Sequence, residues 1–133
     1  MLVVDASVVV AFLIDPSRRN AIRARFLEGG DDLHAPAHLD LEVLSALRRL
    51  VLAGRLPDSR ASAAARDLTD LPLVRHPIEP LVDTVWALRG DITPYDAAYV
   101  AAARRNGWTL VSTDIADLAS KGLAVTPDAA DYP

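Results

Sequence analysis

The chain has 133 residues, 51% of them hydrophobic, and a formal net charge of −4. This length predicts a single domain that is large enough for a real core. The absence of cysteine excludes a disulfide framework and a thiolate metal site or nucleophile, and the acidic balance gives no sign of nucleic-acid binding through overall charge.

The chain opens with two apolar runs separated by a carboxylate. Leu2–Val4 is apolar and β-branched, as expected of a buried strand, and it ends at Asp5. The second run, Ala6–Ile14, is far shorter than the ~20 apolar residues that span a bilayer, and no cationic segment precedes it. We therefore expect a cytoplasmic protein with no membrane segment.

Asp5 has two interpretations. It can cap the helix that follows, or it can be a metal-binding carboxylate at the carboxyl end of a central strand, where open α/β sheets place their ligands. A carboxylate between apolar runs is costly to bury unless it is paired, hydrogen-bonded or bound to a metal. The choice depends on whether other acidic residues converge on the same place.

Helices and strands then alternate. Asp15-Pro16-Ser17 ends the first helix and opens a second. The elements that we expect up to residue 89 are a helix over Ser17–Glu28, a strand over Asp32–Ala35, a helix from Pro36 to about Ala53, a helix over Asp58–Asp70, a strand over Leu71–Arg75 and a helix over Glu79–Arg89 that packs Trp86 in or near the core.

The helix that starts near Pro36 carries two candidate acids. Asp40 and Glu42 lie on opposite shoulders of its apolar stripe, so helical periodicity alone does not decide which of them points into a cleft. His34 and His38 have Pro36 between them and match no HExxH pattern, so we expect ordinary polar roles for both.

A second informative stretch is Asp91–Gly107. Thr93 suits the N-cap of a helix and Pro94 its first position. Asp96 then falls in the first turn, on the same face as Tyr99. It could simply complement the helix dipole, which favours acids there by ~0.3–1 kcal/mol, but its alignment with the buried face favours a position beside a crevice.

The end of the chain repeats the Asp5 arrangement. An apolar strand over Trp108–Val111 runs directly into Ser112, Thr113 and Asp114, and Asp117 shares a side of a helical turn with Asp114. A last strand over Leu123–Thr126 and an acidic tail complete the expected elements.

Strands that alternate with helices predict an α/β fold with a mostly parallel sheet covered on both faces. Asp5 and Asp114 then lie at one edge of the sheet, within reach of Asp96 and of either Glu42 or Asp40. Converging carboxylates repel one another unless a cation intervenes, and an all-oxygen ligand set selects Mg²⁺ or Mn²⁺. Such ions activate water and stabilise the leaving oxygen of a phosphodiester.

Four segments together resemble a known family: LVVDASVVV, HLDLEVLSAL, TPYDAAYVAAA and LVSTD. In this order they resemble the PIN-domain ribonucleases, and more narrowly the VapC toxins of type II toxin–antitoxin systems. The likeness runs from Met1 to about Thr126. It implies a single PIN-like domain over residues 1–133, built as a three-layer sandwich, and a metal-dependent endoribonuclease.

The resemblance also assigns roles. It implies the catalytic acids Asp5, Glu42, Asp96 and Asp114, and a Mg²⁺ or Mn²⁺ site formed by Asp5, Asp96, Asp114 and Asp117, although Asp117 lies one residue further from Asp114 than in the usual pattern. Ser7, Ser112 and Thr113 match supporting hydroxyl positions. The implied partners are an RNA substrate, a cognate VapB-type antitoxin and a second copy of the chain.

Two other classes of protein fit the sequence less well. An aspartyl-phosphate phosphatase needs an acid two residues after Asp5 and a lysine near the last strands, whereas the chain has Ser7 and a single lysine, Lys121. A non-catalytic PIN-like RNA-binding or scaffold module stays open, although such modules usually lose acids and all four positions here are acidic. The sequence does not choose among tRNA, rRNA and mRNA.

Overall fold

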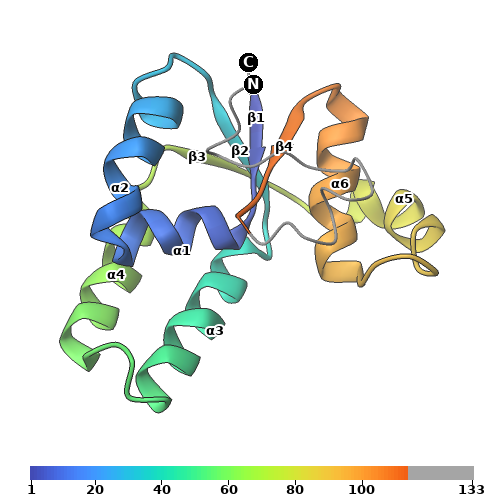
Figure 1. Cartoon of the computed structure of the whole chain (residues 1–133). Coiled ribbons are helices and arrows are strands. Elements are labelled where there is room, and N and C mark those ends of the chain that lie inside the picture. The colour runs from blue at the N-terminus through green and yellow to red at the C-terminus, as the bar shows by residue number, and fades with distance from the viewer. Residues whose placement is uncertain (114–133) are drawn as a thin grey trace.

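The computed structural model describes residues 1–113, apart from the side chain of Leu27, and shows helices on both faces of a central sheet (Figure 1). The strands are β1 (Leu2–Val4), β2 (Leu33–Pro36), β3 (Leu73–His76) and β4 (Thr109–Val111), in the order β3-β2-β1-β4. Each neighbouring pair is parallel, which confirms the predicted α/β fold. Asp114, Asp117, the expected strand at Leu123–Thr126 and the acidic tail lie outside the described residues.

Helices connect the strands and cover the sheet. They are α1 (Ala6–Ile14), α2 (Pro16–Ile22) with its π-helical continuation η1 (Arg23–Leu27), α3 (Leu39–Leu52), α4 (Asp58–Asp70), a 3-10 turn η2 (Glu79–Leu81), α5 (Val82–Ala87) and α6 (Pro94–Asn106). None of the helices described over residues 1–113 is long and apolar enough to cross a membrane.

Local sequence signals explain where the site-forming helices begin. Asp5 accepts a hydrogen bond from the Val8 N–H and so starts α1 directly after β1. Thr93 caps α6, with Pro94 at its first position, and Gly107 ends that helix in the left-handed conformation at φ 67°. Because α1, α3 and α6 all begin at the carboxyl ends of the strands (Figure 1), their first turns meet at one edge of the sheet.

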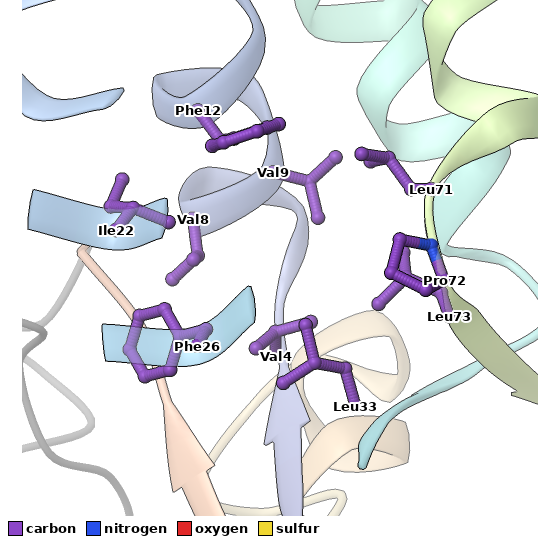
Figure 2. Close-up of a pocket in the computed structure, with 10 residues that line it drawn as sticks. All are labelled: Val4, Val8, Val9, Phe12, Ile22, Phe26, Leu33, Leu71, Pro72 and Leu73. Atoms are coloured by element: carbon purple, nitrogen blue, oxygen red, sulfur yellow. The ribbon is translucent and has the colours of Figure 1, made fainter. Parts of the chain in front are cut away.

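The alternation of side chains along the strands divides the core into two layers. On one face Val4, Leu33 and Leu73 meet apolar residues of α1, α2 and η1 around a small cavity of about 30 Å³ (Figure 2). On the other face, α6 contacts β1, β2 and β4. The residues lining the cavity are all apolar, so we expect it to be dry.

Two expectations were wrong in detail. The helix predicted from Pro36 begins only at Leu39, because Pro36 is the last residue of β2, paired with His76, and the next N–H, that of Ala37, donates to the His76 carbonyl at 2.7 Å. Trp86 is 65% exposed instead of packed, with the Arg89 guanidinium 4.7 Å above its ring. The short helix α5 has no fully buried residue, so its tryptophan faces outward.

Candidate active site

Asp5 lies at the carboxyl end of β1 and both interpretations of it meet there. Its backbone N–H extends the ladder to the Val111 carbonyl at 3.2 Å. Its Oδ1 accepts hydrogen bonds from the Ser7 hydroxyl at 2.5 Å and from the Val8 N–H at 3.2 Å. The capping interpretation is therefore confirmed. Capping is compatible with metal binding by the same side chain, because an ionised carboxylate has about four lone-pair positions on two oxygens.

A hydroxyl cluster joins the start of α1 to the end of β4. Ser7 Oγ accepts a hydrogen bond from the Thr113 N–H at 2.9 Å and lies 3.3 Å from Ser112 Oγ. Ser112 is fully buried. The three predicted supporting residues thus lie beside Asp5, and they hold the chain in place up to the residue before Asp114.

Burial controls the ionisation of Asp5, whose exposed fraction is 8%. Desolvation raises the pKa of this carboxyl, and hydrogen bonds from Ser112, Ser7 and the Val8 N–H oppose the rise without cancelling it. A divalent cation beside Asp5 would favour the ionised form. A metal bound here therefore competes with a proton for this carboxylate, and the competition weakens as the pH rises.

The structure separates the two acids of α3. Glu42 faces the same cleft as Asp5. Asp40 faces elsewhere and binds Arg75 of β3, whose Nε and Nη2 donate to its carboxylate at 2.8 Å and 3.0 Å. The alternative that helical periodicity left open is thereby answered in favour of Glu42 as the acid in the cleft.

Two side chains hold the carboxylate of Glu42. The Tyr99 hydroxyl donates to Oε1 at 2.6 Å, and His38 Nε2 lies 3.1 Å from the same oxygen. Burial raises the pKa of Glu42, but the hydrogen bonds from His38 and Tyr99 and the positive charges of His38 and Arg49 outweigh it and hold that pKa below its ordinary value. Glu42 therefore stays ionised more readily than Asp5.

Asp96 completes the described acids of the site. Its backbone N–H donates to Thr93 Oγ1 at 3.3 Å, and its partly buried side chain lines the cleft from the first turn of α6. The predicted position beside a crevice is confirmed. Thr113, the neighbour of Asp114 in the sequence, lines the same cleft.

The cleft has a volume of about 700 Å³, within the ~300–1,000 Å³ typical of ligand pockets. Among residues 1–113, no three His, Asp or Glu side chains form a ready metal-binding group. Asp5, Glu42 and Asp96 nevertheless surround one cleft and offer only oxygen, which fits a hard divalent ion. Asp114 and Asp117, which the family resemblance assigns to the metal, lie outside the described residues.

Sequence reasoning missed part of the site. The sequence predicts only an ordinary polar role for His38, although its spacing of four residues from Glu42 allows contact along a helix. Tyr99 was recognised only as a neighbour of Asp96 on one face. Arg18 and Arg49 also line the cleft, and the spacing of seven residues between Glu42 and Arg49 is the signal that could have indicated it.

The chain is similar to known proteins over most of its length. The profile of the PIN domain matches residues 2–120. The chain is 41% identical to "Ribonuclease VapC3" of Mycobacterium tuberculosis over 114 residues, which cover 85% of this chain and 82% of that protein. It is 35% identical to "VapC ribonuclease Mb0985" of Mycobacterium bovis over 127 residues, or 96% and 95% of the two chains.

A solved structure has the same fold. It is described as a toxin–antitoxin complex from Klebsiella pneumoniae, and it superimposes with a TM-score of 0.65 at 16% identity, over 96% of this chain and 98% of that one.

Proposed function

The chain belongs to the PIN-domain family, and within it to the VapC ribonucleases, and on this basis we propose that it is an endoribonuclease that acts as the toxin of a VapBC-type toxin–antitoxin pair. The observation that carries the proposal is the convergence of Asp5, Glu42 and Asp96 on one cleft at the carboxyl ends of the strands. The reaction is the hydrolysis of RNA phosphodiester bonds.

The proposed catalytic acids are Asp5, Glu42, Asp96 and Asp114. Asp5, Asp96 and Asp114, with Asp117, would hold Mg²⁺ or Mn²⁺, and the carboxylate oxygens that Asp5, Glu42 and Asp96 bring to the described cleft support this choice. When bound, the ion supplies positive charge that activates water and stabilises the leaving oxygen.

Glu42 has the role of general base. Its carboxylate lines the cleft beside Asp5 and Asp96, and its two hydrogen bonds within the described residues both end on Oε1. Oε2 is then the oxygen that can accept a proton from the attacking water. Tyr99 and His38 act through Glu42, because they fix the orientation of its carboxylate.

The partners follow from the same premise. We propose a VapB-type antitoxin that covers the cleft, supported by the likeness to the fold of a toxin–antitoxin complex. Exposed Leu44 and Leu52 of α3, beside a groove between α3 and α4, offer apolar surface for such a partner. A homodimer and a single domain over residues 1–133 belong to the same proposal.

The deciding experiment is RNA cleavage by the purified protein with Mn²⁺ or Mg²⁺, compared with EDTA. Asp96→Asn should abolish cleavage and leave the fold intact, whereas Asp83→Asn, an exposed acid at the start of α5, should cut like the wild type. Equal cleavage by wild type and Asp96→Asn would refute the site. No metal-dependent cutting and no metal-induced stabilisation would favour the non-catalytic module.

A further inference from the structure

One edge of α3 carries both an acid and an arginine into the cleft. Glu42, Ala46 and Arg49 all line it, and their spacing of four and three residues places them on one side of the helix. Seven residues of helix correspond to a rise of ~10 Å. The guanidinium therefore enters the cleft about two helical turns away from the catalytic acids.

The opposite wall of the cleft, formed by α1 and the start of α2, also carries an arginine away from the strand ends. α1 runs from Ser7, beside the acids, through Val10 to Ile14, and Arg18 follows on α2; all four residues line the cleft. Figure 1 shows α1 and α3 both extending away from the strand ends. The cleft is thus a trough with three acids at the strand ends and, further out, Arg49 on one wall and Arg18, next to Asp15, on the other.

The guanidinium of Arg49 is available for a ligand. Within the described part of the chain it has no hydrogen bond or ion pair, and its recorded interaction is an attraction to Glu42. Arg75 on the other side of α3, in contrast, is held by Asp40 and by the Leu68 and Leu73 carbonyls.

Guanidinium groups match phosphate oxygens through paired hydrogen bonds. A protein with a net charge of −4 needs local positive charge where a polynucleotide lies. A stacked strand places a phosphate every ~3.4 Å along its axis, so the distance along α3 corresponds to about three nucleotides or fewer. The ordinary interpretation is a solvated arginine with no ligand, and it predicts that Arg49 behaves like any exposed arginine of α3.

We propose that Arg49 binds a backbone phosphate of the RNA within about three nucleotides of the bond that is cut. This inference rests on the proposed endoribonuclease function. It assigns the outer trough to single-stranded RNA and makes Arg49 a positioning residue, because it acts on a phosphate away from the reacting atoms.

Arg48 provides a matched control. It is the neighbouring residue on α3 and is also exposed, but it lines the groove between α3 and α4. Arg49→Gln and Arg48→Gln therefore remove the same charge from the same helix on different sides. Both positions are exposed, so both variants should fold, which equal melting temperatures would verify. Arg49→Lys keeps the charge but loses the paired geometry.

The measurement is steady-state cleavage of a labelled single-stranded RNA of mixed sequence at several salt concentrations, with the Mn²⁺-induced thermal shift recorded alongside. Arg49 also helps to hold the pKa of Glu42 low, so the comparison is made on the pH plateau of cleavage, where Glu42 is ionised in every variant. There, Arg49→Gln should raise KM about 5-fold with little change in kcat, because the contact is the same in the ground and transition states. It should also reduce the slope of log(kcat/KM) against log[salt] by ~0.7, the value for one phosphate contact on a single strand. Arg48→Gln should change neither, and Arg49→Lys should fall between.

The experiment distinguishes a failure of this inference from a failure of the proposed function. If the wild type cuts RNA and the two glutamine variants share one KM and one salt slope, this inference is wrong and the nuclease stands. If the Mn²⁺ shift collapses in Arg49→Gln, the arginine acts on the metal site and the phosphate role is wrong. If the wild type neither binds nor cuts RNA, both the inference and the proposed function fail.

Discussion

The Tyr99 hydroxyl donates a hydrogen bond of 2.6 Å to Oε1 of Glu42 and so joins α6 to α3 across the cleft. Burial, the hydrogen bond to Glu42 and the negative charges of Glu42 and Asp5 all raise the pKa of Tyr99. The phenol therefore keeps its proton at every physiological pH and is a permanent donor to the carboxylate. This pair couples the positions of two helices that each contribute an acid.

Removing that donor should affect the chemistry more than the fold. Tyr99→Phe keeps the buried ring and loses a hydrogen bond to a charged but partly exposed group, so we expect a loss of ~1–2 kcal/mol in the free energy of unfolding. The pKa of Glu42 should rise toward its ordinary value, which moves the acid limb of the cleavage–pH profile upward. Tyr95→Phe, at an exposed tyrosine of the same helix, is the control, and an unshifted acid limb in Tyr99→Phe would contradict this role.

Substitutions at the two acids of α3 should have different effects, one on stability and the other on RNA cleavage. Asp40→Asn weakens the paired contact with Arg75, whose groups are partly exposed, so it should cost about 1 kcal/mol or less and leave cleavage intact. Glu42→Gln should do the reverse and remove cleavage with little loss of stability. Urea denaturation and cleavage assays on the two variants check this, and an inactive Asp40→Asn that is folded would reverse the assignment.

Substitutions at Asp5 should reveal its two roles. Asp5→Asn keeps a side-chain oxygen that can accept from Ser7 and Val8, whereas Asp5→Ala removes the N-cap of α1 at a cost of ~0.5–2 kcal/mol. Both variants should lose cleavage, but only the alanine variant should be clearly destabilised. Thermal denaturation at neutral pH makes the comparison, and equal melting temperatures for the two variants would mean that the cap contributes nothing.

The raised pKa of Asp5 also determines the direction in which its contribution to stability changes with pH. Its pKa is higher in the folded protein than in the unfolded chain, so the folded state binds more protons between the two values. The free energy of unfolding that Asp5 contributes should therefore fall as pH rises through that window. Unfolding measured across acidic pH should show this falling component in the wild type and not in Asp5→Asn.

The sequence predicted the sheet, the helices and the convergence of acids because each has a local signal. The apolar run before Asp5 places this residue at the end of a strand. Thr93 and Pro94 mark the start of a helix and so place Asp96 in its first turn. Pro36 was misassigned because the same residue suits a helix start and the last position of a strand, and only the register with His76 decides between them.

Other features depend on contacts that periodicity does not contain. Asp40 and Glu42 lie at similar angles from the apolar stripe of α3. Their different roles come from other elements, because Arg75 on β3 binds Asp40 and Tyr99 on α6 binds Glu42. Trp86 was expected in the core because of its size. The indole instead lies on the exposed side of α5, with the Arg89 guanidinium above its ring, and an apolar pattern does not show which side of a short helix packs.

The apolar cavity between the sheet and α1 offers a test of the core. Val9 lines it (Figure 2), and one added methyl group at this position should fill part of the space. We expect Val9→Ile to stabilise by ~0.5–1 kcal/mol, the reverse of a typical Ile→Val loss. Val43→Ile is the control, because Val43 is fully buried and does not line the cavity, so the larger side chain should cost ~1–3 kcal/mol. Denaturant midpoints of the two variants decide, and a destabilised Val9→Ile would mean that the cavity cannot accept the group.

Metal binding should depend on pH in the direction that Asp5 dictates. Because burial raises the pKa of Asp5 and a bound cation requires its ionised form, Mn²⁺ or Mg²⁺ must displace a proton, and affinity should increase from acidic to neutral pH. The metal stabilises the protein because it binds only the native state. The free energy of unfolding rises by ~2.7 kcal/mol when the metal concentration is a hundred times Kd. Thermal shifts with and without Mn²⁺ across this pH range measure it, with Asp83→Asn as a control that should match the wild type. In Asp5→Asn the shift should be small at every pH, and a wild-type shift that stays constant from acidic to neutral pH would exclude Asp5 as a ligand.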